Sequence, residues 1–180
     1  MNHKIINKQP AAKDCFICGT ENDASVKAEF YNLDDGRVIC LFKAKDIHGG
    51  HPGILHGGVI CSILDETAGR AMSVLSPGTT GALTMQLDTS FKEVVPTNLE
   101  LMAVGWLEEV REKVYISRSE IFLPDGTVAA YCRGVYYRLK DPSKNDHYHK
   151  VYPQVQDRFE IDVPDTEGTW VTEMPEELKK

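Results

Sequence analysis

One helix-forming segment, apolar on nearly every side, most constrains how this chain of 180 residues can fold. Residues 58–74 follow two glycines and end before the turn-forming sequence SPGTTG, which predicts a single helix there. A helix so nearly covered with apolar and small side chains cannot lie on a surface, and must be wrapped by a sheet or by a partner. The rest of the chain is therefore expected to supply that covering layer.

Six runs with the composition of β-strands flank this helix. They cover residues 26–32, 36–44, 82–94, 99–110, 113–123 and 127–139. An Asp-Gly turn joins the first two, and the connections between the last four are short, which favours an antiparallel meander. The order of the segments predicts an α+β fold with one helix packed on an antiparallel sheet.

The ends of the chain differ in composition from this central region. Residues 1–14 are polar and are expected to be a flexible segment, followed by a domain over residues 15–140. Residues 141–180 are predicted to be an acidic extension, draped over the domain or partly disordered, and too short for a second domain.

Charge and composition argue against several classes of function. The net charge is −7 and the basic residues are scattered, so we expect no nucleic-acid partner. No apolar run reaches the roughly 20 residues that span a bilayer, and the N-terminus lacks the apolar core of a secretory signal. The odd number of cysteines, five, favours reduced thiols. We expect a cytoplasmic protein that does not bind a membrane.

Two adjacent acids interrupt the apolar helix. Glu66 lies four residues before Arg70, the favourable order for an intrahelical ion pair, so we predict a structural role for it. The residues four positions before and after Asp65 are Cys61 and Gly69, so Asp65 has no such ion-pair partner along the helix. Aspartate is also a poor residue in the middle of a helix. Either Asp65 takes part in chemistry, or it accepts a hydrogen bond from a buried hydroxyl or amide.

Gly57 and Gly58 stand where the helix begins. Backbone N–H groups there have no intrahelical acceptor, and without a Cβ atom a ligand oxygen can approach them closely. The helix dipole adds a positive potential at the same place, which suits an oxyanion that develops in a transition state. A tight turn would explain the glycines alone, but together with Asp65 they favour a functional site.

The sequence HPGILHGGVICSILDETAGRA, residues 51–71, resembles the His-Gly-Gly…Asp helix of hotdog-fold thioesterases of the phenylacetyl-CoA and 4-hydroxybenzoyl-CoA thioesterase-like group. The order of the predicted elements and the leading CFICG sequence are similar to that group too, and the resemblance covers residues 15–139. It implies a hotdog fold, in which an antiparallel sheet wraps around one long central helix.

The resemblance also implies hydrolysis of an acyl-CoA thioester to a free acid and CoA. Its catalytic residues would be Gly57 as the oxyanion donor, His56 as the motif histidine, Asp65 as the nucleophile or general base, and Thr84 beside the water. Gly58 and His51 are the expected substrate-binding residues. Several relatives have an asparagine shortly before the motif histidine, and His51 or His48 is the candidate replacement in this chain.

The expected partners are an acyl-CoA substrate and further copies of this chain, in a homodimer or homotetramer. Gly57 and Asp65 lie about 12 Å apart along one helix, so a single chain cannot present both to one carbonyl group. Cys15 and Cys18 have the spacing of zinc ligands, but no second pair appears, and we predict neither a metal nor a cofactor. The alternatives are a hotdog hydratase for enoyl or 3-hydroxyacyl thioesters and a non-catalytic acyl-CoA-binding module.

Overall fold

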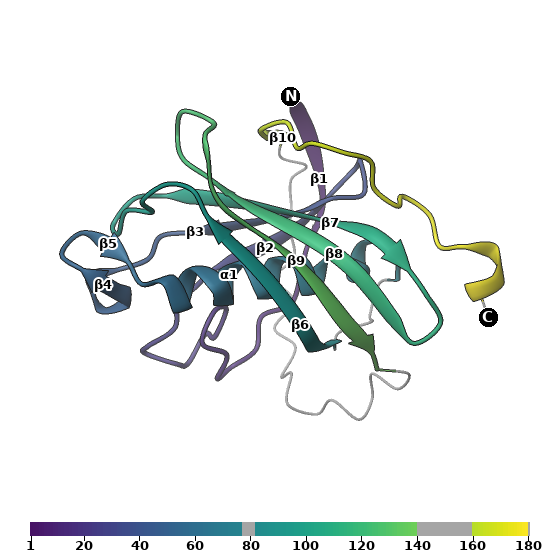
Figure 1. Ribbon diagram of the computed structural model, residues 1–180, viewed down its shortest axis with the longest axis horizontal. Coiled ribbons are helices and arrows are strands. Elements are labelled where there is room, and N and C mark those ends of the chain that lie inside the picture. The colour runs from purple at the N-terminus through teal and green to yellow at the C-terminus, as the bar shows by residue number, and fades with distance from the viewer. Residues whose placement is uncertain (77–81, 140–159, 180) are drawn as a thin grey trace.

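The computed structural model describes residues 1–76, 82–139 and 160–179 (Figure 1). Eight strands form one antiparallel sheet in the spatial order β10-β1-β2-β3-β7-β8-β9-β6. Their bounds are β1 Asn2–Lys8, β2 Glu29–Leu33, β3 Val38–Phe42, β6 Ala82–Phe91, β7 Leu101–Val110, β8 Val114–Phe122, β9 Val128–Arg138 and β10 Glu160–Asp162. A short hairpin, β4 Gly49–His51 and β5 Ile54–Leu55, precedes the helix α1 Gly57–Arg70. The further helical turns within these described ranges are η1 Asp46–His48, α2 Met72–Leu75 and η3 Glu176–Leu178.

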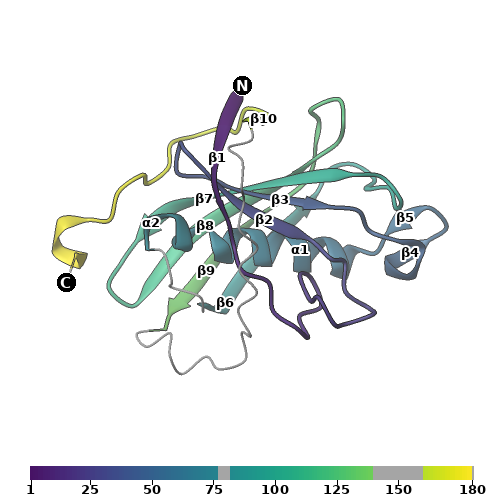
Figure 2. The same ribbon diagram turned by 180° about the vertical axis from the view of Figure 1, so that it is seen from behind.

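The sheet curves around α1, as Figures 1 and 2 show from opposite sides, and the predicted α+β hotdog fold is confirmed. The helix packs against β3, β6, β7, β8 and β9. Buried serines of β8 fix it to the sheet, since Ser117 Oγ donates to the Ala68 carbonyl and Ser119 Oγ to the Leu64 carbonyl, both at 2.7 Å. Because these hydroxyls are paired, they cost little to bury and hold the helix in register with the sheet.

The helix is shorter than predicted. It ends at Arg70, and residues 72–75 form the separate helix α2. At the junction the Ala71 N–H donates to the Ala68 carbonyl three residues earlier, so the last turn tightens and the helical axis is interrupted.

The predicted meander of four strands is wrong in one pairing. β7, β8 and β9 follow one another in the sheet, but β6 pairs with β9 at the sheet edge instead of with β7. Residues 92–100 carry the chain back across, held by bonds from the Lys92 N–H to the Ala129 carbonyl and from the Asn98 N–H to the Ala44 carbonyl. The strand-like runs could be read from composition, whereas this pairing depends on a crossing that composition does not encode.

The N-terminus forms a strand where we expected a flexible segment over residues 1–14. β1 pairs with β2 on one side and with β10 on the other, and Ile5 is buried. Burial of this side chain and two ladders of backbone hydrogen bonds offset the entropy lost by ordering the segment. Its partner β10 comes from the opposite end of the chain, so the sequence near β1 carries no sign of the pairing.

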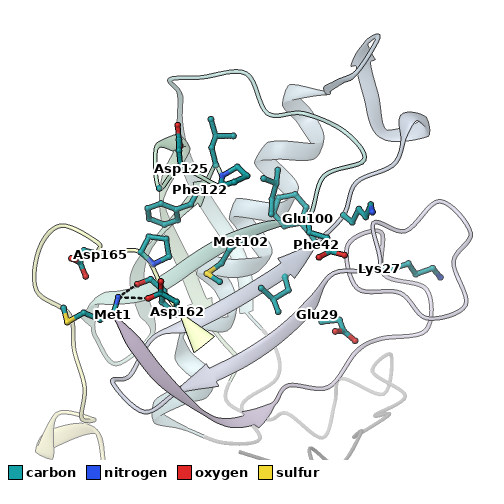
Figure 3. A pocket seen from close by; sticks show the side chains of 18 residues that line it. Met1, Lys27, Glu29, Phe42, Glu100, Met102, Phe122, Asp125, Asp162 and Asp165 are labelled. Carbon is teal, nitrogen blue, oxygen red and sulfur yellow. Dashed lines mark hydrogen bonds and ion pairs between the residues drawn. The ribbon is translucent and has the colours of Figure 1, made fainter. Parts of the chain in front are cut away.

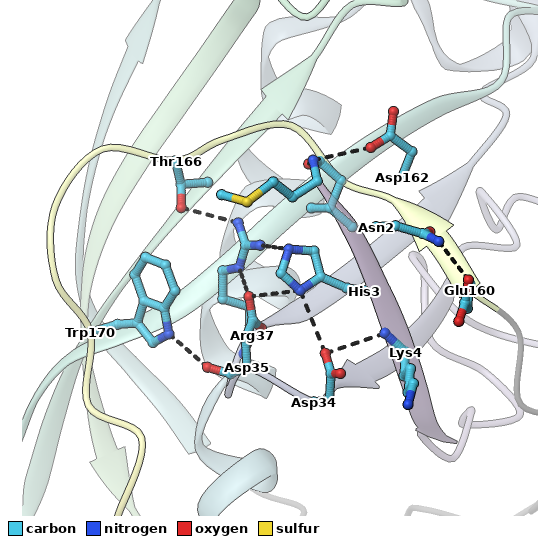
Figure 4. A network of polar contacts seen from close by, with 12 residues as sticks. Asn2, His3, Lys4, Asp34, Asp35, Arg37, Glu160, Asp162, Thr166 and Trp170 are labelled. Carbon is cyan, nitrogen blue, oxygen red and sulfur yellow. Dashed lines mark hydrogen bonds and ion pairs between the residues drawn. The ribbon is translucent and has the colours of Figure 1, made fainter.

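The described part of the acidic extension, residues 160–179, runs over the outer face of the sheet, and Val163 is fully buried there. Figure 4 shows the polar network that fixes it around Arg37, whose side chain is only 3% exposed. Arg37 pairs with Asp35 at 2.7 Å, donates to Thr166 Oγ1 at 3.2 Å and lies 5.0 Å from the centre of the Trp170 ring. The extension is therefore anchored through a buried charge and an aromatic side chain.

Neither α-helix in the described ranges combines the length and the apolar character required to cross a membrane.

Candidate active site

Asp65 lies at the middle of α1 with its carboxylate facing the edge strands of the sheet. Thr84 Oγ1 on β6 donates to Asp65 Oδ1 at 2.9 Å and lies 3.2 Å from Oδ2. Tyr136 Oη on β9 donates to Asp65 Oδ1 at 3.1 Å and lies 3.2 Å from the Asp65 carbonyl oxygen. The carboxylate is thus oriented by two hydroxyl donors, and Oδ2 is the oxygen with less of its hydrogen-bonding capacity in use.

The sheet places these two hydroxyls by its register. Thr84 and Tyr136 are direct partners on the neighbouring strands β6 and β9. The Tyr136 ring needs space on both sides: a Cβ atom at Gly134 would lie 2.4 Å from the ring, and one at Gly69 would lie 3.3 Å from it. A strand glycine and a helix glycine therefore allow the phenol to reach Asp65.

Burial and hydrogen bonding act in opposite directions on the Asp65 carboxyl group. Burial raises its pKa above the ordinary value, while the hydrogen bonds from Thr84 and Tyr136 lower it in part. Burial, followed by the adjacent charge of Asp65, raises the pKa of Tyr136, so the phenol stays protonated and remains a donor. A carboxylate whose pKa is raised is a stronger base than an ordinary aspartate and is better suited to accept a proton.

The start of α1 supplies a backbone donor. His56 is the N-cap, and its Nδ1 accepts a hydrogen bond from the Gly58 N–H at 2.9 Å. That amide is therefore engaged in capping, which argues against the expected use of its N–H in substrate binding. Gly57 is the first helical residue, so its N–H has no acceptor within the helix and points out of the helix end. Of the two glycine amides, the Gly57 N–H is the one suited to an oxyanion.

The histidines fall into different surroundings. His51 ends β4 and is exposed in the hairpin that precedes the helix. His48 is buried, with Nδ1 accepting from the Lys45 N–H at 3.0 Å and Nε2 lying 3.0 Å from the Ala24 carbonyl oxygen. Because both ring nitrogens are engaged in the fold, His48 is excluded as a replacement for the missing asparagine.

The structural role predicted for Glu66 is confirmed, since its Oε1 lies 2.8 Å from Arg70 Nη2. Glu66 also belongs to a cluster with Cys15 and Cys18, whose three possible ligand atoms lie within 4.8 Å of one another. The Arg70 guanidinium lies 3.2 Å from Cys18 Sγ, where a cation already balances the cluster. Among the residues that the structure describes, the cluster offers three ligand atoms, one fewer than the four of a closed zinc site.

Sequence reasoning missed Tyr136 as a site residue. It lies 71 positions from Asp65, and its contact with that residue depends on the pairing of β6 with β9. The sequence did carry one signal. A glycine in the middle of a strand often marks a place where another group approaches the backbone closely, and Gly134 lies two residues before Tyr136, on the same face of the strand.

A pocket of about 850 Å³ lies elsewhere, among the N-terminus, residues 162–165 and the turn after β8 (Figure 3). Met102, Phe122 and Val163 supply apolar surface to it, and Asp125, Asp162 and Glu100 line it with acids. None of the predicted site residues lines this pocket. Lys27 and Lys43 add basic side chains to its lining.

Part of the chain is similar in sequence to a known protein family. The sequence model of the Thioesterase superfamily matches residues 52–130, which include α1, β6, β7, β8 and the start of β9. The chain is 30% identical over 118 residues to acyl-coenzyme A thioesterase THEM4 of Rattus norvegicus, covering 65% of this chain and 49% of that protein. It is 26% identical over 112 residues to acyl-coenzyme A thioesterase THEM5 of Homo sapiens, covering 62% and 44%. The chain thus spans about half the length of the curated relatives it matches.

Solved structures share the fold. A thioesterase superfamily protein superposes with a TM-score of 0.63 at 26% identity, covering 69% of this chain and 60% of that one. Zebra fish thioesterase superfamily member 2 superposes with a TM-score of 0.59 at 15% identity, covering 68% and 90%. Residues 52–130 therefore match the thioesterase superfamily in sequence, and the sheet and helix that they help to build have the hotdog fold of its solved members.

Proposed function

We propose that this protein hydrolyses acyl-CoA thioesters, with Asp65 as the reacting carboxylate. The observation that carries the proposal is the Asp65 carboxylate itself, held by Thr84 and Tyr136 in the middle of an otherwise apolar helix. The substrate class comes from the relatives, which are named acyl-coenzyme A thioesterases.

The chemistry follows from the two oxygens of Asp65. Both hydroxyls lie closer to Oδ1, with Thr84 Oγ1 3.2 Å from Oδ2, so Oδ2 takes a proton from a water molecule, whose oxygen attacks the thioester carbonyl carbon. The carbonyl oxygen becomes negative and accepts the Gly57 N–H at the positive end of the helix. Collapse of this intermediate breaks the carbon–sulfur bond and releases the acid and the CoA thiol. Direct attack by Asp65 would instead form an acyl-carboxylate anhydride, which water then hydrolyses.

Each site is proposed to combine Asp65 of one chain with Gly57 of another. Eight residues of helix put these groups about 12 Å apart within one chain, beyond the few ångströms that the reaction allows. β6 offers the surface for a second copy, since it is an edge strand with exposed Leu83, Met85 and Phe91. Unpaired backbone and exposed apolar side chains on one edge favour association about a two-fold axis, in a dimer or a dimer of dimers.

The test is release of CoA thiol from a panel of saturated acyl-CoA thioesters, followed with a chromogenic thiol reagent. The wild-type chain should release thiol, and Asp65→Asn should lower kcat by about 10² to 10⁴, the usual contribution of a general base. Asp23→Asn, the same change in an exposed loop, is the matched control and should keep the wild-type rate.

Two outcomes would contradict the proposal. Hydration of enoyl-CoA without any thiol release would favour the hydratase alternative. Tight binding of acyl-CoA with no turnover, unaffected by Asp65→Asn, would favour a binding module.

A further inference from the structure

Cys15 and Cys18 form a turn against the face of α1 that does not carry Asp65. The Gly19 N–H donates to the Cys15 carbonyl oxygen at 2.9 Å and closes the turn. A Cβ atom at Gly19 would lie 2.1 Å from that oxygen, so only glycine permits this geometry. In a turn this tight, Cα atoms three residues apart lie within about 7 Å, which overlaps the range that a disulfide needs.

Two backbone amides point at the sulfur of the first cysteine. The Ile17 N–H and the Cys18 N–H both donate to Cys15 Sγ at 3.3 Å. Donors aimed at a sulfur stabilise its anionic form. Hydrogen bonds from the Cys18 thiol and from these amides together lower the pKa of Cys15 to about 6, against the effect of burial.

The second cysteine differs from the first. Cys18 is buried, with 3% of its surface exposed, whereas Cys15 is partly exposed. The hydrogen bond to Cys15 and burial raise the pKa of Cys18, so it stays a thiol. An accessible thiolate beside a buried thiol is the arrangement in which one sulfur attacks and the other resolves.

Two charged residues of α1 complete the arrangement. Arg70 Nη2 donates to Cys18 Sγ at 3.2 Å, and the Cys18 thiol faces Glu66 Oε1 at 4.0 Å. The carboxylate can take the thiol proton, and the guanidinium can stabilise the thiolate that forms. Asp65 turns instead toward Thr84 and Tyr136, so the two sites use different side chains, although the charge of Glu66 helps to raise the pKa of Asp65.

We propose that Cys15 and Cys18 form a thiol–disulfide exchange site that reacts with small-molecule disulfides. The Cys15 thiolate attacks one sulfur of the disulfide RSSR, forming a mixed disulfide and expelling RS⁻, which takes a proton from water. Cys18 then gives its proton to Glu66, and its sulfur attacks Cys15 Sγ, expelling the second RS⁻, which is protonated in turn. The pair, which starts as one thiolate and one thiol, loses two electrons and one proton. RSSR gains the two electrons and becomes two RSH, with one proton from Cys18 by way of Glu66 and one from water.

The test uses the full chain, glutathione disulfide as the probe, and intact mass with peptide mapping after acid quenching and alkylation. The wild type should lose two of its five thiols, retain no glutathione and give a cross-linked Cys15–Cys18 peptide. Cys18→Ser should stop with one glutathione on Cys15, and Cys15→Ser should react at least tenfold more slowly. Cys61→Ser, which removes a partly exposed thiol outside the pair, is the control and should behave as wild type.

Further measurements can overturn the assignment. The alkylation rate of Cys15 should rise through pH about 6, where an unperturbed thiol would rise near pH 8.5. Alkylation that rises only near pH 8.5, or the absence of a glutathione adduct in Cys18→Ser, would refute the proposal. So would stoichiometric zinc in the purified protein whose removal by a chelator is required before the thiols react.

Discussion

Replacing Tyr136 by phenylalanine tests the electrostatics of the proposed site, because it removes one donor to Asp65 and leaves the ring in place over Gly134. A hydrogen bond to a charged group is worth about 1.5–3 kcal/mol. Tyr136 Oη lies 3.1 Å from Asp65 Oδ1 and 3.2 Å from the Asp65 carbonyl oxygen, so its hydrogen bond is shared between the two acceptors. We therefore use the lower end of this energy range, about 1.5 kcal/mol. At 1.36 kcal/mol for each pKa unit, the pKa of Asp65 should rise by about one unit.

The direction in which the pKa of Asp65 moves determines how the assay is designed. A donor favours the ionised carboxylate, so its loss makes Asp65 harder to ionise and moves the acid limb of kcat/KM to higher pH. Below this limb Tyr136→Phe should be about tenfold slower than wild type, and well above it the two rates should converge. The matched control is Tyr115→Phe, whose ring stacks on Tyr136 but whose hydroxyl donates to the Gly69 carbonyl at 2.5 Å. An acid limb that stays fixed in Tyr136→Phe, or moves equally in Tyr115→Phe, would refute the reasoning.

Three further predictions concern the surrounding structure. His56→Ala should lower the free energy of unfolding by about 1 kcal/mol, seen as a lower Tm, because the helix loses its cap. His56→Asn keeps a capping oxygen and should keep the stability of the wild type. Equal losses of stability in the two variants would contradict the capping role. Glu66→Gln should lower the free energy of unfolding, measured with denaturant, by about 1 kcal/mol. It should reduce kcat far less than Asp65→Asn does. Abolished turnover in Glu66→Gln would show that Glu66 carries the hydrolysis. Arg37→Met breaks a buried ion pair, so amide hydrogen exchange in residues 160–171 should become at least tenfold faster. Exchange at the wild-type rate in those residues would show that Arg37 does not anchor the extension.

The sequence allowed local structure and part of the site to be predicted, but not the long-range pairing. The apolar helix and the strand-like runs carry their own periodicity and composition, and the Glu66–Arg70 pair follows from spacing along one helix. The resemblance named Asp65 and Thr84 as site residues, with Thr84 beside the water, and the structure brings their side chains within 2.9 Å of each other. Tyr136 could not be predicted because its role depends on which strand lies beside β6.

The pairing of strands from the two ends of the chain could not be predicted from the sequence either. β1 is stabilised by β10, with Asn2 opposite Asp162, and no local pattern near either residue indicates such a distant partner. The cap at His56 was also missed as a structural role, because histidine is an uncommon N-cap and its function followed from the resemblance instead.

The most direct test of the account is complementation between two inactive variants, Asp65→Asn and Gly57→Pro, unfolded and refolded together. Proline removes the Gly57 N–H and is tolerated at a helix start. His56 before it is already extended, at φ −65° and ψ 135°, and a Cβ atom at residue 57 would meet only Phe91 at 3.7 Å.

Random pairing gives half mixed dimers, each with one intact site and one site broken twice. If Asp65 of one chain serves Gly57 of the other, about a quarter of the wild-type thiol release should return. If both parents and the mixture are folded, exchange subunits and stay equally inactive, the shared site is refuted.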